Sequence, residues 1–327
     1  MRSKGRFQIS SIPNWLTAVF LCSALFWSPI AAGAATELKV SYLYTLSDFY
    51  GPLPYNWARL AIDYDHDEIY VVDRRERDVT VFNAMGMEVY RFGGDGSLGG
   101  VIDVAVKKDG RILVLSKRSL ETAILVCDFR GEPQSEIVLK NFPPDFAGFS
   151  PDRMVYQADR LYLLDMAAMR LAVTDAGGLF RDGYDLGALV GVADAEKRAA
   201  TEIGGFSVDR RGNMLFTIPV LFAAYRLSPD GKLTGFGQAG SSPGRFNVVG
   251  GIVADDKGYY YVADRLKSAV IIFDKDFKFQ REFGFRGFRP ENLIGPRQLA
   301  LDARGNLYVS QLRGKGVSVF KIDHDQP

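Results

Sequence analysis

A short pattern recurs every 45 to 52 residues and constrains the fold more than any other feature of this chain. Each copy joins a short apolar segment, a tight polar turn and two further apolar segments, and the clearest copies are Phe206–Phe216, Ile252–Val262 and Leu299–Val309. The corresponding third-segment positions are Phe82, Cys127, Thr174, Arg226, Phe273 and Phe320. A period of this length predicts stacked supersecondary units that bury a continuous core between them.

The pattern within each copy is that of short β-strands. Apolar residues alternate with polar ones, and no long helical periodicity interrupts them. The turns at 209–212, 255–258 and 302–305 read Asp-x-x-Gly. Gly accepts the positive φ of such a turn, and Asp accepts hydrogen bonds from the backbone that follows. Four short strands in a unit of roughly 45 residues are typical of a propeller blade.

The copies predict an all-β, six-bladed β-propeller of four-stranded antiparallel blades. The expected blades span residues 57–93, 101–139, 153–186, 205–237, 251–284 and 297–322. The last blade has three strands only, whereas an unassigned strand, 38–46, precedes the first blade. We expect this N-terminal strand to complete the last blade, because it would close the ring and remove exposed strand edges.

The blade sequences resemble NHL-repeat propellers. The resemblance rests on Phe236–Asn247 with Gly251–Asp255 and Tyr261–Asp264, and again on Phe283–Pro290 with Gly295–Asp302. Blades two and three depart from the pattern, since Lys107 replaces the turn Asp and 157–160 lacks the turn Gly. The resemblance implies a platform of the kind that mostly binds proteins, RNA or glycans and is only sometimes an enzyme.

The first 34 residues have the features of a bacterial signal peptide. A basic start precedes an apolar stretch at 15–27, which is short for a membrane span, and Ala32-Gly33-Ala34 fits a cleavage site. The expected domain is therefore 35–327, exported to the periplasm or the exterior without stable membrane insertion. Retention as an N-terminal membrane anchor is the alternative.

The charge and cysteine content limit which partners the chain is expected to bind and which disulfides it can form. Removal of residues 1–34 leaves 37 basic and 39 acidic residues, so we expect no nucleic-acid partner. Only Cys127 remains, which excludes an intramolecular disulfide, and its apolar strand predicts a buried, inert thiol.

Few residues have the pattern of catalytic or metal-binding groups. His66, in the first hairpin, and His324, in the C-terminal tail, show no shared metal-ligand spacing, so no metal or cofactor is expected. The segment Tyr50–Trp57 loosely resembles part of the sugar-lactonase propellers, which hold a divalent cation in the channel. Tyr50 stands where those enzymes have a ligating acid, and Asp103 is then the remaining channel carboxylate. We expect Trp57 instead to pack between blades.

Cations gather in the loops that follow the second strands, all on one propeller face. Arg59, Arg153 and Arg297, near the starts of inner strands, are expected at the same end. The loop of blade four differs, because it is apolar, and a helix within 193–202 either covers it or leaves it exposed. The predicted binding residues are Arg74, Arg75, Lys117, Arg118, Arg265, Arg313, Val220, Leu221 and Phe222.

These observations favour a non-enzymatic binding or scaffold module of the bacterial envelope or exterior. The channel-mouth face that carries the cations is expected to bind a protein partner or an anionic ligand such as a glycan. Pairing of the cations with Asp73, Asp165 and Asp264 would weaken this interpretation. The alternative is a propeller hydrolase or lyase of the sugar-lactonase type with a degenerate divalent-metal site.

Overall fold

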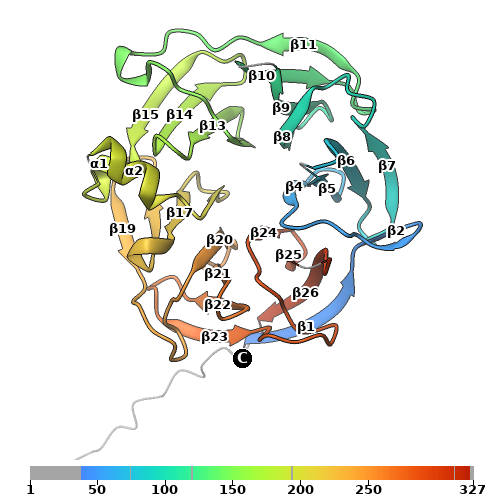
Figure 1. Ribbon diagram of the computed structural model, residues 1–327, viewed down its shortest axis with the longest axis vertical. Helices are drawn as coiled ribbons and strands as arrows, with labels where there is room; N and C mark the ends of the chain where they lie inside the picture. Colours follow the sequence, from blue (N-terminus) through green and yellow to red (C-terminus); the bar gives the residue numbers. More distant parts are fainter. Residues whose placement is uncertain (1–37, 74, 119–120, 193, 313, 325–327) are drawn as a thin grey trace, which may run out of the picture. The chain divides into compact units, whose positions relative to one another are not determined.

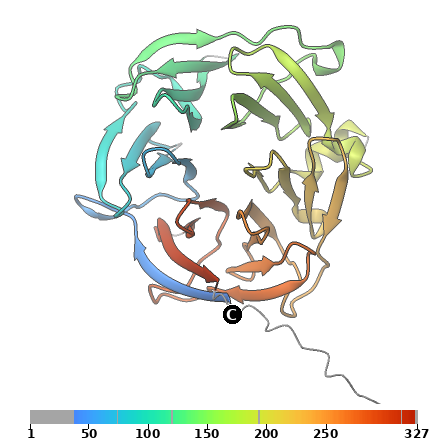
Figure 2. The same ribbon diagram turned by 180° about the vertical axis from the view of Figure 1, so that it is seen from behind.

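The computed structural model describes residues 38–324 except 74, 119, 120, 193 and 313, and all of these belong to one compact unit, Thr36–Gln326. Six four-stranded antiparallel sheets surround a common centre as the blades of a β-propeller (Figure 1). The same ring is seen from behind in Figure 2. The proposed signal segment 1–34 lies outside the described residues. Within them, no helix is long and apolar enough to cross a bilayer.

Blades 1 to 5 are meanders whose first strand is innermost, and blade 6 follows the same order with β1 as its outer strand. Blade 1 contains β4 (Arg59–Asp63), β5 (Glu68–Asp73), β6 (Asp78–Phe82) and β7 (Glu88–Phe92). Blade 2 contains β8 (Gly100–Val106), β9 (Ile112–Arg118), β10 (Glu121–Cys127) and β11 (Pro133–Ile137). Blade 3 contains β12 (Arg153–Gln157), β13 (Arg160–Asp165), β14 (Arg170–Asp175) and β15 (Phe180–Asp185).

The second half of the ring follows the same plan. Blade 4 contains β16 (Gly205–Val208), β17 (Met214–Ile218), β18 (Ala223–Leu227) and β19 (Leu233–Phe236). Blade 5 contains β20 (Val249–Ala254), β21 (Tyr260–Asp264), β22 (Ala269–Phe273) and β23 (Phe279–Phe283). Blade 6 contains β24 (Gln298–Leu301), β25 (Asn306–Ser310), β26 (Val317–His324) and β1 (Leu38–Thr45).

The expected closure of the ring by the N-terminal strand is confirmed. Strand β1 pairs antiparallel with β26, from Leu38 opposite His324 to Thr45 opposite Ser318, with one irregularity near Tyr42. Figure 1 shows β1 beside β26 on the outside of the last blade. Strand β26 extends two residues beyond the expected end of the blade at 322. His324 therefore belongs to a strand and not to a tail.

The core lies between neighbouring blades, because alternate side chains of each strand face the adjacent sheet. Tyr261, in blade 5, and Phe320, in blade 6, are fully buried in one such layer. Cys127 is buried in the layer around blades 1 and 2, as predicted. Burial is the main reason that the pKa of its thiol is raised to about 11, which leaves it protonated and unreactive.

The turns between first and second strands have the chemistry that the sequence predicts. Gly212 has a φ of +81°, a value that Gly adopts without strain. Asp209 accepts hydrogen bonds from the backbone amides of Arg211 and Asn213, both at 2.9 Å. Gly305 and Asp302 repeat this arrangement in blade 6. The turn carboxylates are thus committed to the backbone.

Short elements occupy the connections. Helices α1 (Leu186–Leu189) and α2 (Ala195–Thr201) lie between blades 3 and 4, where helix-forming composition was noted, and are capped by Asp185 and Asp194. The remaining elements are the 3-10 turns η1 (Pro144–Phe146) and η2 (Pro219–Leu221) and the hairpin β2 (Ser47–Asp48) and β3 (Gly51–Pro52).

Candidate functional site: the central channel

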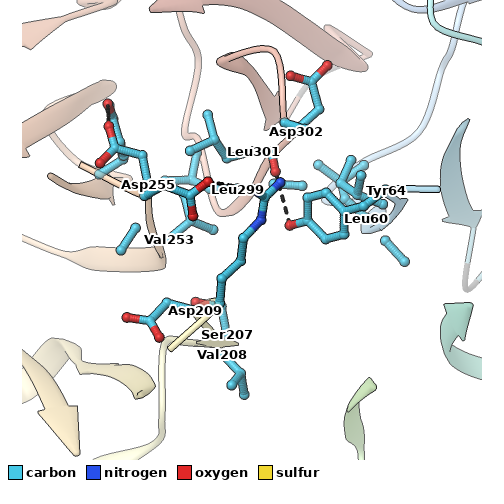
Figure 3. A pocket seen from close by; sticks show the side chains of 18 of the residues that line it. Leu60, Tyr64, Ser207, Val208, Asp209, Val253, Asp255, Leu299, Leu301 and Asp302 are labelled. Atoms are coloured by element: carbon cyan, nitrogen blue, oxygen red, sulfur yellow. Dashed lines mark hydrogen bonds and ion pairs between the residues drawn. The ribbon is translucent and has the colours of Figure 1, made fainter. Parts of the chain in front are cut away.

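A cavity of about 670 Å³ occupies the centre of the propeller. All six innermost strands contribute to its lining, which includes Leu60, Val104, Val155, Val208, Val253 and Leu299. Apolar side chains thus occur on every wall, but the lining as a whole exposes more polar than apolar surface, and Figure 3 shows several of the lining side chains from close by. A cavity of this volume is in the range of small-molecule sites, which is roughly 300–1,000 Å³.

The cavity reaches the propeller face that carries the turns between first and second strands, which we call the first-hairpin face. Four of these turns supply lining residues: Tyr64 from blade 1, Asp209 and Arg210 from blade 4, Asp255 to Lys257 from blade 5, and Asp302 to Gly305 from blade 6. The innermost strands start at the opposite face, which carries the turns between second and third strands and is called the second-hairpin face. The cavity thus opens on the face opposite to the one on which the sequence predicted the binding residues.

One side chain crosses the mouth of the cavity. Arg210, on the turn of blade 4, places its guanidinium carbon 4.9 Å from the ring centroid of Tyr64, on the turn of blade 1. The same guanidinium pairs with Asp256 of blade 5. The Tyr64 hydroxyl donates to the carbonyl of Leu301 at 3.1 Å, as drawn in Figure 3. Four blades are therefore linked across the opening.

A hydrogen-bonded cluster of titratable groups borders the cavity between blades 5 and 6. Nε2 of His324 lies 2.9 Å from an Asp255 carboxylate oxygen, and the Tyr261 hydroxyl donates to the same oxygen at 2.8 Å. Burial alone would raise the pKa of Asp255. The hydrogen bonds from His324, the Tyr259 amide and Tyr261 outweigh burial and hold that pKa below its ordinary value. Nδ1 of His324 is buried without a hydrogen-bond partner among the described residues.

The inner end of the cavity is charged. Arg153 lines it at the start of β12, and one Asp103 carboxylate oxygen lies 3.4 Å from both the Arg153 and the Arg59 guanidinium. Side chains of all three residues are almost completely buried. Arg59 and Arg153 were expected among the cations of the second-hairpin face. They instead lie inside the ring, because Asp103 and backbone carbonyls draw them inward.

The environment of Asp103 does not fit a divalent cation. Two guanidiniums already face this one carboxylate, and a third positive group would be repelled. Tyr50 is fully exposed at the tip of the β2–β3 hairpin, away from the cavity lining. Within the described residues, no three His, Cys, Asp or Glu side chains are grouped to hold a metal ion. His66 hydrogen-bonds Asp63 at 2.8 Å, and this bond raises the pKa of His66.

Those predicted binding residues that the structure describes lie on the second-hairpin face. Arg74 and Arg313 fall outside the described residues, whereas Arg75, Lys117 and Arg118 are exposed. Arg265 is half-buried, and its guanidinium lies 4.8 Å from the ring centroid of Trp57. Trp57 also contacts Arg297 at 4.9 Å and donates to the Gly295 carbonyl. Trp57 thus packs between blades 1, 5 and 6, as expected.

The apolar loop of blade 4 is not covered by helix α2. Val220, Leu221 and Phe222 keep 54%, 41% and 38% of their surface exposed. Phe222 also has a φ of +52°, a strained value for a bulky residue. The loop therefore remains an exposed apolar patch on the second-hairpin face.

The acidic residues near the predicted cations accept hydrogen bonds from backbone amides. Asp73 accepts a hydrogen bond from the Arg75 amide, and Asp165 accepts from the amides of Ser150 and Ala168. Asp264 likewise accepts from the amides of Asn247 and Lys267. These carboxylates order loop backbone and act as loop caps, and among the described residues no ion pair joins them to the predicted cations.

No protein-family model and no curated protein sequence matches the chain. Its fold is similar to that of solved propellers. A protein of unknown function from Bacteroides thetaiotaomicron superposes with a TM-score of 0.63 and 14% identity, over 88% of this chain and 77% of that one. Virginiamycin B lyase from Staphylococcus aureus gives 0.58 and 12%, over 87% and 99%. An auxiliary nutrient binding protein from Bacteroides ovatus gives 0.58 and 14%, over 88% and 78%. At these identities the likeness concerns the fold alone.

Proposed function

We propose that this protein is an NHL-type binding module of the bacterial envelope that holds a small organic molecule in its central channel. The observation that carries the proposal is the cavity of about 670 Å³, whose lining comes from all six blades. Ligand sites combine apolar side chains with convergent polar groups, and this cavity has both, with the polar surface in excess. The export features of residues 1–34 support a location in the periplasm or outside the cell.

The second-hairpin face has a separate part in this proposal. Its exposed apolar loop in blade 4 and its exposed cations in blades 1 and 2 are together suited to a protein partner that carries acidic groups. A ligand in the channel and a partner on the opposite face would not compete for surface. The propeller would then work as a scaffold that presents or senses its ligand.

A thermal-shift screen with small organic molecules tests the channel site. Ala303 lies exposed at the cavity mouth, so Ala303→Trp would narrow the opening without disturbing the core. Lys108 has the same turn position in blade 2, whose contribution to the lining ends at Val106. A ligand at 100 times its Kd stabilises the protein by about 2.7 kcal/mol. We expect Ala303→Trp to lose this stabilisation and Lys108→Trp to keep it, and equal stabilisation of both variants would contradict the proposal.

A lyase or hydrolase function is the second candidate. The observation that favours it is His324, which is held by Asp255 at the cavity edge and whose Nδ1 has no hydrogen-bond partner among the described residues. A carboxylate-oriented imidazole is a common general base. The test is turnover of a panel of cyclic esters by the purified protein. Turnover that is lost in His324→Gln would support this candidate, and turnover that persists would exclude His324 as the base.

A further inference from the structure

We propose that Arg153 holds the carboxylate of an organic acid at the inner end of the channel, with the apolar body of the acid lying between the walls. This inference rests on the proposed channel site and specifies its ligand class. It predicts a molecule with one negative charge at one end.

Arg153 is a buried residue whose guanidinium has hydrogen-bond donors without an acceptor among the described residues. It lines the cavity, and only 8% of its side-chain surface is exposed. Nη2 donates to the Phe206 carbonyl at 3.5 Å, which is long for a hydrogen bond. Nε and Nη1 have no hydrogen-bond partner among the described residues. A buried charged donor without a partner is costly, so a group that accepts from it gains more than the same group would at the surface.

Asp103 does not satisfy the remaining hydrogen-bond donors of Arg153. Its carboxylate approaches Nη1 of Arg153 at 3.4 Å without the geometry of a hydrogen bond, and it approaches Arg59 at the same distance. The same carboxylate accepts hydrogen bonds from the amides of Met154 at 3.0 Å and Val104 at 3.2 Å. One carboxylate therefore serves two guanidiniums and two amides.

The charge balance at this end of the channel favours a single added negative charge. One Asp103 carboxylate is shared between the Arg59 and Arg153 guanidiniums, so Arg153 does not have the undivided charge of one carboxylate. Asp152 is another acid near Arg153, and burial raises its pKa although the guanidiniums of Arg59 and Arg153 oppose the change. Its ionised form is thus disfavoured. A monoanion such as a carboxylate would be attracted to Arg153.

Apolar side chains are present along the cavity between Arg153 and the mouth. The lining follows β12 from Arg153 to Gln157, four residue steps that correspond to roughly 13 Å. Leu60, Val208 and Val253 lie on the surrounding strands. A carboxylate at Arg153 would therefore leave room for an alkyl or other apolar body that extends toward the mouth.

The test compares octanoate with octanamide by isothermal titration calorimetry on the mature protein. The two probes share an apolar chain and differ in charge. We expect octanoate to bind at least ~10-fold more tightly, the effect of one charge-assisted hydrogen bond. Arg153→Met should remove this preference, Arg153→Lys should keep part of it because the charge stays, and Arg304→Met, at the mouth, should keep all of it.

The outcomes separate this inference from the proposed function. Equal binding of the acid and the amide by the wild-type protein would overturn the assignment of Arg153 and leave the channel as an apolar site. Binding of neither probe would overturn this inference, whereas the thermal-shift screen decides the proposed channel site separately. If Arg153→Met does not fold, the wild-type comparison and Arg153→Lys decide. A preference for octanoate that survives in folded Arg153→Met would show that Arg153 has a structural role only.

Discussion

Nε2 of His324, the last residue of β26, lies 2.9 Å from a carboxylate oxygen of Asp255, on the first turn of blade 5. This contact joins the end of blade 6 to blade 5 beside the cavity mouth. Tyr261 donates to the same carboxylate from within blade 5. The Asp255 carboxylate therefore holds together two blades whose chain segments are far apart in sequence.

Replacement of Asp255 by Asn should destabilise the fold in a pH-dependent way. The folded-state pKa of Asp255 is lowered, so its contribution is complete above the unfolded value of about 3.9 and is lost as the pH falls below it. We expect Asp255→Asn to cost on the order of 2 kcal/mol at pH 5 and progressively less toward pH 2.5. Urea unfolding across that range measures this, with the exposed Asp256→Asn as control. A cost that is independent of pH would contradict the assignment.

A chain that begins at Ser47 should lose much of its stability. It lacks β1, so β26 would become an exposed edge and Leu38 would leave its buried position in blade 6. We expect aggregation or a clearly lower melting temperature than that of a chain beginning at Ala35. Thermal unfolding and size-exclusion chromatography check this, and identical melting of the two chains would show that β1 does not hold the ring closed.

The repeat predicted the ring, because every blade needs the same strands and the same turn chemistry. The closure of the ring could be predicted because one strand, 38–46, had no blade of its own. The channel site was harder to predict, since its residues come from six blades and are adjacent only after the ring forms. Arg153 and Asp103 show this, because neither sequence position indicates that their side chains meet. The sequence places His324 in a tail, whereas the pairing of Leu38 with His324 extends β26 to this residue.

The sequence analysis also did not predict a role for the residues that directly follow the turn Asp. Asp209 and Asp302 drew attention to the turns as structural elements, which they are. Arg210 and Ala303, inside the same turns, line the mouth of the cavity. A search for non-Gly, non-Asp residues that vary among equivalent turns would have found them, because such positions are free of backbone requirements.

Replacement of Arg210 by Ala should open the channel mouth. Arg210 and Asp256 are both exposed, so their pairing contributes less than about 1 kcal/mol to stability. We expect Arg210→Ala to fold normally and to increase both association and dissociation rates of a channel ligand such as octanoate. Stopped-flow kinetics measures the rates, and Arg211→Ala serves as control. Unchanged rates in Arg210→Ala would mean that Arg210 does not restrict the opening.

Phe222 should matter for partner binding more than for folding. It is partly exposed and adopts a positive φ, so Phe222→Gly relieves backbone strain and should leave stability unchanged or raise it by up to about 1 kcal/mol. A buried interface Phe is worth on the order of 2 kcal/mol. We expect weaker capture of a partner from envelope extract, whereas Phe129→Ala, an exposed Phe in another turn, should have no effect. Equal capture by both variants would exclude the loop.

The exposed cations of the second-hairpin face should act on association rate. Arg75 has 89% of its side chain exposed, so Arg75→Glu would change long-range attraction without removing a buried contact. With the captured partner in hand, surface plasmon resonance at two salt concentrations should show slower association and a smaller salt dependence. The same kinetics as the wild type would remove Arg75 from the binding face.

A crystal structure of the mature propeller with octanoate tests the central claim most directly. The account predicts the acid inside the channel, with its carboxylate within hydrogen-bond distance of Nε or Nη1 of Arg153 and its chain beside Leu60, Val208 and Val253. Octanoate found only on the outer surface or on the second-hairpin face, with an unoccupied channel, would contradict it.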